Sequence, residues 1–214
     1  MIRIRLLLFA TDDLTLLHRV SLTALILMTK PSSLRLLLLL LALPWLAACT
    51  ELSIAIANAP TNGDTLEVGK DEVFDAEAGL SLDWYRPADR ADQTLPVILF
   101  FYGGSWQDGD RADYRFVAAS LAERGYLVVV PNYRKSPQVD FTTIMQDGAR
   151  ATRWVHDQLD RLRGNPQRFY LMGHSAGAHL AALLATQNQW LQAVDLTPGV
   201  IAGVVGLAGP YDFT

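Results

Sequence analysis

Four short apolar segments, separated by stretches with helical periodicity, most constrain the fold of this 214-residue chain. They lie at residues 96–102, 126–131, 168–173 and 200–209, and each is apolar nearly continuously rather than at alternate positions. Such segments are typical of strands in a sheet that is covered on both faces. The order strand, helix, strand predicts the α/β class, with a mostly parallel, doubly wound sheet.

Two further strands and three helices complete the expected domain. Partial alternation on either side of Gly79 predicts two short antiparallel strands before the first buried one. We expect a first helix that is capped by Asp113 and ends at Gly125, because aspartate favours the first position and glycine follows the last. A long helix is expected over about 142–163, and an alanine- and leucine-rich helix after residue 175.

The front of the chain differs in charge from the rest. Residues 1–48 hold five Lys/Arg and two Asp/Glu, whereas the remainder holds 13 and 20. A basic, leucine-rich front before an acidic body is typical of a targeting segment. An acidic body without basic clusters also argues against nucleic acid as a partner.

Within this front, Lys30 and Arg35 precede the apolar run Leu36–Leu46, which leads into the sequence "LAAC" ending at Cys49. This arrangement resembles the lipobox of bacterial lipoprotein signal peptides, in which the cysteine is lipidated and becomes the mature N-terminus. The resemblance implies a lipid-anchored protein of the bacterial cell envelope. An ordinary cleaved signal or a transmembrane anchor is the alternative.

We accordingly divide the chain into an N-terminal extension with signal peptide (1–48), a tether (49–64) and an α/β domain that we expect to be incomplete (65–214). The signal is complete from Met28 onward, so Met28 is one candidate start, and a long leader is the other. Cys49 is the sole cysteine, so no disulfide within the chain is possible.

The sequence Gly173-His174-Ser175-Ala176-Gly177 stands between the third buried segment and the helix after it. This G-x-S-x-G pattern in a strand–turn–helix context is typical of a nucleophile elbow, in which a sharp turn exposes the serine. Gly173 and Gly177 remove side chains that would collide with neighbouring backbone. Ser175 would lie near a helix N-terminus, whose dipole favours a developing negative charge.

A serine nucleophile needs two backbone N–H groups to stabilise the oxyanion that forms at the attacked carbonyl. One is expected from the residue after the nucleophile, Ala176, and the other from the loop after an earlier strand. Gly103 and Gly104 follow the first buried segment, where glycine allows close approach of the backbone. We therefore predict an oxyanion hole formed by Gly103, Gly104 and Ala176.

Together the segments "FFYGGSW", "GYLVVVPNYR", "DGARATRWV" and "MGHSAGAHLAALLA" resemble the α/β-hydrolase superfamily over about residues 80–214. The similarity is to its carboxylesterase and lipase branch, related to hormone-sensitive lipase and to feruloyl esterases. In that branch the oxyanion motif has a histidine where this chain has Tyr102. The resemblance implies hydrolysis of small carboxylic esters through an acyl-enzyme on Ser175, without a metal or cofactor.

The superfamily also places an acid and then a histidine base after the serine. Only 39 residues follow Ser175, and the predicted helix and strand occupy most of them. We expect the last strands, the acid and the base to lie beyond residue 214, and this form to be impaired or inactive. The last strand would then be an exposed apolar edge. None of the four histidines is favoured as the base: His18, His156, His174 and His179.

Two aspartates near the predicted site are expected to have structural roles. We expect Asp212 to be a loop residue rather than the catalytic acid, and Asp147 to organise neighbouring loops through Arg134 or Arg150. Two alternatives to an esterase stay open. One is a catalytically inactive lipoprotein or binding module that retains the elbow, and the other is an amidase or formamidase, because the same scaffold hosts both.

Overall fold

The computed structural model describes residues 65–212, so the predictions for the signal peptide, the tether and Cys49 lie outside the described residues. Six strands form one mixed sheet, in the order β1-β2-β4-β3-β5-β6. The strands are β1 (Leu66–Asp75), β2 (Leu80–Pro87), β3 (Leu95–Phe101), β4 (Leu127–Pro131), β5 (Gly164–His174) and β6 (Gly203–Leu207).

The first two strands pair antiparallel, and β2 pairs antiparallel with β4. The other pairs, β3 with β4, β3 with β5 and β5 with β6, are parallel. This confirms the predicted α/β class with a mostly parallel sheet. The turn that joins β1 to β2 contains Gly79 at φ 67°, a conformation that glycine adopts without steric cost.

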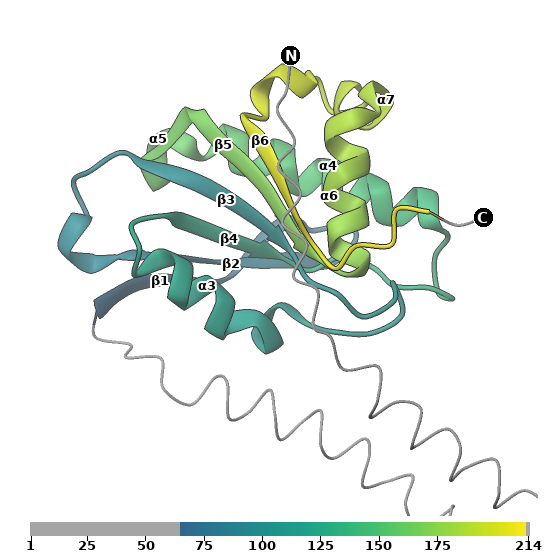
Figure 1. Ribbon diagram of the computed structural model, residues 1–214, viewed down its shortest axis with the longest axis horizontal. Helices are drawn as coiled ribbons and strands as arrows, with labels where there is room; N and C mark the ends of the chain where they lie inside the picture. The colour runs from purple at the N-terminus through teal and green to yellow at the C-terminus, as the bar shows by residue number, and fades with distance from the viewer. Residues whose placement is uncertain (1–64, 213–214) are drawn as a thin grey trace, which may run out of the picture. The chain divides into compact units, whose positions relative to one another are not determined.

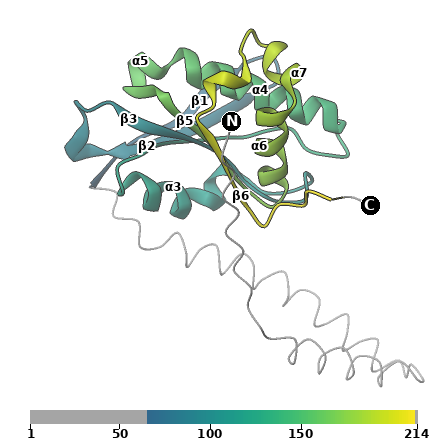
Figure 2. The same ribbon diagram turned by 45° about the horizontal axis from the view of Figure 1, so that its top comes forward.

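Helices cover both faces of the sheet (Figures 1 and 2). On one face lies α3 (Arg115–Ala122), and on the other lie α4 (Phe141–Asp157) and α6 (Ala176–Thr186). The short helices α5 (Leu159–Leu162) and α7 (Asn188–Gln192) follow α4 and α6. The 3-10 turns are η2 (Ala88–Arg90), η3 (Arg111–Tyr114) and η4 (Pro198–Val200).

Because the sheet is covered on both faces, its central strands are apolar throughout. Every residue of β4 is buried, and all of β3 except Pro96 is buried. The carboxyl ends of these two buried strands, β3 and β4, lead into the loops 102–110 and 132–140. Removal of this apolar area from water is the main force that stabilises the sheet.

The start of the first helix differs from our prediction. Asp113 is not the first cap: η3 begins after Asp110, whose side chain accepts a hydrogen bond from the Ala112 N–H. Asp113 instead accepts from the Asp110 N–H, which completes a capping box. The two aspartates are three residues apart, which is the spacing of a capping box, and the 3-10 turn places the cap at the earlier one.

Among the described residues, β6 lies at one edge of the sheet and pairs only with β5. Its side chains Val205 and Leu207 are 45% and 41% exposed. The prediction of an exposed apolar last strand is confirmed for the part of the chain that the structure describes. No helix between residues 65 and 212 has the length and apolar character needed to cross a membrane.

Candidate active site

Ser175 occupies the sharp turn between β5 and α6, as the sequence predicted. Its backbone has φ 52° and ψ −121°, which an L-residue adopts only when the surrounding structure imposes it. The Ser175 N–H donates to the carbonyl oxygen of Leu207 on β6, at 2.8 Å. This hydrogen bond from the neighbouring strand β6 helps to hold Ser175 in its strained conformation at the carboxyl edge of the sheet.

The two glycines of the elbow are required by close backbone contacts. A Cβ at Gly173 would lie 2.2 Å from the carbonyl oxygen of Gly177. A Cβ at Gly177 would lie 2.1 Å from the carbonyl oxygen of Phe101, at the end of β3. Both distances are far below van der Waals contact, so a larger residue at either position would displace backbone. The structure therefore confirms that glycine is needed at both positions because a side chain would collide with neighbouring backbone.

The loop 103–110, here called the oxyanion loop, packs directly against the elbow. A Cβ at Gly103 would lie 3.1 Å from the Cβ of Ser175. Gly104 has φ 129°, and a Cβ there would lie 2.1 Å from the Asp108 carbonyl oxygen. Ser105 and Trp106 also have positive φ, 53° and 60°. The loop therefore turns sharply beside Ser175, at the position that the sequence predicted for the oxyanion donors.

The amide of Gly103, one of the predicted donors, has a partner within the protein. Its N–H donates to the Tyr114 hydroxyl at 3.3 Å, and the same hydroxyl lies 2.9 Å from Nδ1 of His174. The roles of Gly103, Gly104 and Ala176 toward an oxyanion stay predictions. Gly103 does lie against Ser175, and Gly104 and Ala176 are the residues that follow Gly103 and Ser175 in the chain. Tyr114 was not singled out from the sequence, because no local pattern links it to residues 103 or 174.

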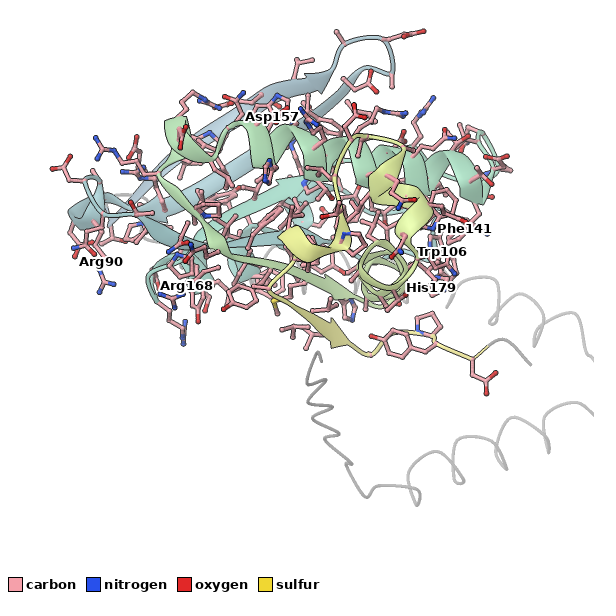
Figure 3. All side chains as sticks on the ribbon, turned by 90° about the horizontal axis from the view of Figure 1, so that it is seen from above. Arg90, Trp106, Phe141, Asp157, Arg168 and His179 are labelled. Atoms are coloured by element: carbon pink, nitrogen blue, oxygen red, sulfur yellow. The ribbon has the colours of Figure 1, made fainter. Side chains whose placement is uncertain are left out.

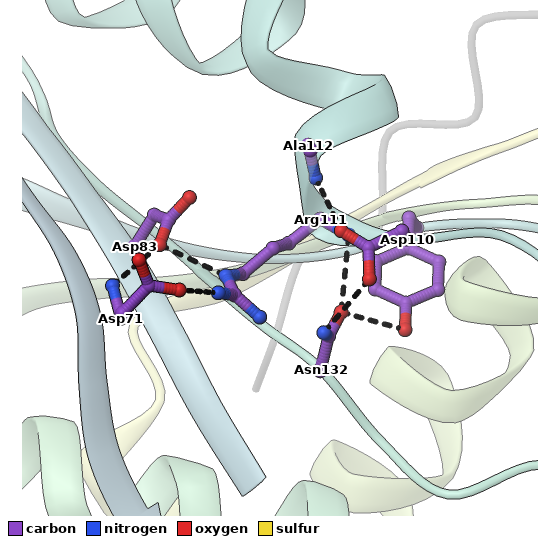
Figure 4. A network of polar contacts seen from close by, with 7 residues as sticks. Asp71, Asp83, Asp110, Arg111, Ala112 and Asn132 are labelled. Carbon is purple, nitrogen blue, oxygen red and sulfur yellow. Dashed lines mark hydrogen bonds and ion pairs between the residues drawn. The ribbon is translucent and has the colours of Figure 1, made fainter.

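Asn132, at the end of β4, joins the two ends of the oxyanion loop (Figure 4). Its Oδ1 accepts from the Tyr102 hydroxyl at 3.0 Å and from the Arg111 N–H at 3.0 Å. Its Nδ2 donates to Asp110 at 2.9 Å. The side chain of Arg111 extends to Asp83, at 2.8 Å from Nε, and forms an ion pair with Asp71. One amide side chain thus holds the loop's entry and exit together.

Tyr102, which stands where the resembling family has a histidine, is fully buried. Its ring stacks on Tyr133 with centroids 4.6 Å apart, and the Tyr133 hydroxyl donates to the Tyr102 carbonyl oxygen at 2.9 Å. Burial raises the pKa of both tyrosines well above the ordinary value. Lys135 donates to the Tyr102 hydroxyl at 3.2 Å. Tyr102, at the position where the family has histidine, is therefore part of a packed layer of aromatic rings under the loop.

Three rings meet beside the first turn of α6 (Figure 3). Trp106 lies edge-on to Phe141 and to His179, with centroids 6.0 Å and 5.6 Å away, and Phe141 stacks on His179 at 5.5 Å. Phe141 is 39% exposed. Burial lowers the pKa of His179, since the apolar surroundings disfavour the charged imidazolium. These three rings, called the aromatic wall below, meet where the oxyanion loop, to which Trp106 belongs, contacts α4 and α6.

The described histidines have surroundings that match structural roles. His174 contacts Tyr114, His179 packs in the aromatic cluster, and His156 on α4 has its Nδ1 3.9 Å from Asp157. His18 lies outside the described residues. Asp212 is exposed in the segment after β6. The catalytic acid and base are accordingly unassigned among residues 65–212.

Asp147 has the structural role that was predicted for it, and both candidate arginines contact it. Its fully buried carboxylate accepts from the backbone N–H and the guanidinium of Arg134, at 2.9, 3.0 and 2.7 Å. Arg150 forms an ion pair with the same carboxylate and a second one with Asp75, at 2.6 Å. The charge on a buried carboxylate needs such partners, so this group fixes the loop after β4 to α4.

Several known proteins are similar to this chain. Isoprenylcysteine alpha-carbonyl methylesterase from Arabidopsis thaliana is 32% identical over 150 residues, which are 68% of this chain and 35% of the relative. Kynurenine formamidase from Danio rerio is 34% identical over 134 residues, 63% of this chain and 43% of the relative. The chain thus spans about a third of the length of the first of these curated relatives.

Among solved structures, inhibited esterase B from Lactobacillus rhamnosis superposes with a TM-score of 0.65 at 23% identity. The match covers 79% of this chain and 58% of that one. At this identity the likeness shows the fold. The BD-FAE family, by contrast, matches residues 82–214, which is more than half of the sequence and includes the elbow and the oxyanion loop. The chain therefore belongs to the BD-FAE family of α/β hydrolases.

Proposed function

We propose that this protein is a carboxylic ester hydrolase that acts through an acyl-enzyme on Ser175. The observation that carries the proposal is the Ser175 backbone, held at φ 52° in a strand-to-helix turn with the oxyanion loop packed against it. Relatives named as esterases and methylesterases support the reaction class. In the proposed step, the Ser175 oxygen attacks the ester carbonyl, the alcohol leaves with a proton, and water then releases the acid.

The arrangement favours small esters with an apolar part. The aromatic wall of Trp106, Phe141 and His179 offers apolar surface beside the loop, and an apolar substrate group placed there would be removed from water. The backbone amides around Ser175 would stabilise the oxyanion, and loss of one such donor costs on the order of 3 kcal/mol in other hydrolases.

Hydrolysis of p-nitrophenyl acetate by the 214-residue chain tests the proposal. Because the base is unassigned among the described residues, the assay is run with and without added imidazole, which can take the proton from a serine in place of a histidine. We expect imidazole to raise a rate that Ser175→Ala abolishes. The variant also subtracts the hydrolysis that imidazole catalyses by itself. A folded chain with no Ser175-dependent rate in either condition would contradict the proposal and favour a binding module.

A second candidate, hydrolysis of N-formyl amides, is supported by the relatives named kynurenine formamidase. An amide has a poorer leaving group than an ester and needs protonation of its nitrogen. The same chain, with imidazole, is therefore offered an N-formyl arylamine and an aryl ester in parallel. A Ser175-dependent rate on the amide that equals or exceeds the rate on the ester would favour the formamidase.

We also propose that the protein is anchored to the bacterial envelope through a lipid on Cys49, which the "LAAC" sequence supports. Membrane extraction followed by mass spectrometry tests this. We expect a mature N-terminus at Cys49 that carries acyl chains, and Cys49→Ser should release the protein from the membrane fraction. A protein that retains residues before Cys49 would contradict lipidation.

A further inference from the structure

One tyrosine connects the oxyanion loop to the nucleophile elbow. The Tyr114 hydroxyl lies 3.3 Å from the backbone nitrogen of Gly103 and 2.9 Å from Nδ1 of His174, the residue directly before Ser175. Gly103 begins the loop, and Tyr114 is the last residue of η3, which follows directly after the loop. The loop and η3 therefore fold back, so that the Tyr114 hydroxyl lies beside Gly103, the first residue of the loop.

The donors and acceptors of this contact can be assigned. An amide N–H only donates, so the hydroxyl oxygen accepts from Gly103. The phenol has a single proton, which is then available for Nδ1 of His174. We infer that the phenol donates this proton to Nδ1, which is then the acceptor, and that the imidazole has its own proton on Nε2. A tyrosine that accepts from one segment and donates to the other fixes their separation, whereas a phenylalanine of the same shape would not.

The surroundings hold the hydroxyl in position. The Tyr114 ring packs against Phe100 and Tyr102, with centroids 5.5 and 6.0 Å apart. Its backbone belongs to η3, whose start is fixed by the capping box of Asp110 and Asp113. Burial is the main cause that raises the pKa of the Tyr114 hydroxyl, so it keeps its proton at neutral pH. The contact is therefore a fixed feature of the folded loop.

We propose that Tyr114 is a positioning residue, which holds the Gly103 amide away from the substrate and so leaves the Gly104 and Ala176 amides as the oxyanion donors. The inference rests on the proposed function and deepens it. The Gly103 amide cannot donate to an oxyanion while it donates to Tyr114. With Gly103 fixed against His174, the next amide in the chain, that of Gly104, follows the turn at φ 129°. A displacement of about 1 Å at such a donor can cost on the order of 100-fold in rate.

The first test measures the His174 imidazole and needs no catalytic activity. The chain is labelled with ¹⁵N-histidine, and long-range ¹H–¹⁵N spectra are recorded at pH 8.5, with His174→Asn to assign the signals. We expect the ring proton of His174 on Nε2, with Nδ1 as a hydrogen-bond acceptor. In Tyr114→Phe the Nδ1 signal should move and a mixture of tautomers should form. A wild-type His174 with its proton on Nδ1 would overturn the proposal, as would signals that Tyr114→Phe leaves unchanged.

The second test separates positioning from stability by ester hydrolysis in the presence of imidazole. Tyr114→Phe should lower kcat about 10-fold while KM changes by less than about 2-fold, since the loop is displaced but the aromatic wall is kept. The matched control is Tyr126→Phe. It also removes one tyrosine hydroxyl, but it precedes β4 at the opposite, amino edge of the parallel strands. Midpoints of urea unfolding are measured for both variants, and the comparison is made under conditions in which each is folded.

The two tests separate the failure of this inference from that of the proposed function. A chain with Ser175-dependent hydrolysis in which Tyr114→Phe keeps the wild-type kcat contradicts the positioning role and leaves the esterase intact. A chain without Ser175-dependent hydrolysis contradicts the esterase, and the His174 spectra then decide on their own whether Tyr114 connects the two segments. If Tyr114→Phe does not fold, the tautomer of His174 in the wild-type chain still shows whether Tyr114 donates to Nδ1.

Discussion

The elbow and the oxyanion loop lie side by side at the carboxyl edge of the sheet, yet they are held in different ways. The elbow is fixed mainly by close contact between backbone atoms, because Gly173 and Gly177 leave no room for a side chain. The loop is fixed by side chains that reach it from other elements, chiefly Tyr114, Asn132 and Tyr133. One half of the site is thus defined by absent side chains and the other by specific hydrogen bonds.

This difference sets how each half should respond to change. A contact between backbone atoms has little room to relax, so a single methyl group at the elbow forces α6 away from the strand that it contacts. A hydrogen-bonded loop can lose one partner and keep the rest, at a cost of about 1–3 kcal/mol for each buried group left unsatisfied. The following predictions use this contrast, from the largest expected effect to the smallest.

Gly177→Ala should be the most damaging. The new Cβ would lie 2.1 Å from the Phe101 carbonyl oxygen and 2.4 Å from that of Tyr102, so β3 and α6 have to separate. We expect the free energy of unfolding to fall by at least about 3 kcal/mol, at the upper end of the cost of overpacking. Urea denaturation followed by circular dichroism measures it. Gly199→Ala is the control, because a Cβ there meets only the Thr197 hydroxyl, at 3.5 Å. Equal effects of the two variants would contradict steric fixation of the elbow.

Asn132→Ala should have an intermediate effect. It removes the acceptor for Tyr102 and Arg111 and the donor to Asp110. We expect a loss of about 2 kcal/mol, since partly buried polar groups lose their partners. Exchange of the amide hydrogens of residues 103–110 should become faster, while the amide of Ser175 stays protected. Faster exchange at Ser175 as well would show that the two halves are not held independently.

Alkaline pH should weaken the loop. Burial raises the pKa of Tyr102 and Tyr133 above the ordinary value near 10, so the folded state keeps protons that the unfolded state loses. Their stabilising contribution is complete below about pH 10 and is lost as the pH rises further. Each such tyrosine adds a slope of about 1.4 kcal/mol per pH unit. Urea unfolding between pH 9 and 11 measures this slope, and Tyr133→Phe should reduce it by about one tyrosine. An unchanged slope in Tyr133→Phe would contradict a raised pKa of Tyr133 in the folded state.

Ser105→Gly should have the smallest effect. Ser105 has φ 53°, which costs a non-glycine residue roughly 1–2 kcal/mol, but glycine adds a similar entropic cost in the unfolded chain. The two terms nearly cancel, so we expect a change within about 1 kcal/mol in thermal or urea unfolding. A large loss would mean that the serine side chain, rather than remote partners, holds the turn.

The same contrast explains which features the sequence could reveal. The elbow was predicted residue by residue because its requirement is local: a strand, five residues and a helix. The strands β3 and β4 were equally readable, since burial on both faces leaves a continuous apolar run. For β5 the apolar segment 168–173 marked only the second half, because the strand already begins at Gly164 and its next residues are partly or fully exposed. Asp147 with its arginines was also predicted, although the sequence left two candidates and the structure uses both.

The support of the oxyanion loop could not be predicted in the same way. Tyr114 and His174 are 60 residues apart, and Tyr102 and Asn132 are 30 apart. Such pairs meet only through the order of strands in the sheet. Asp110 carried a partial signal, since two aspartates three residues apart can form a capping box. The sequence favoured Asp113 because it lies closer to the helical periodicity, and the 3-10 turn before α3 shifted the cap.

The hydrogen bond from the Ser175 N–H to Leu207 also bears on how the site forms during protein synthesis. The serine is translated well before its last backbone anchor, and β6 must leave the ribosome and add to the sheet before that anchor exists. Until then the strained turn lacks the contact that holds it from the neighbouring strand. In a nascent chain that already contains Gly173 and Gly177, Ser175 would therefore reach its final geometry only when β6 pairs with β5.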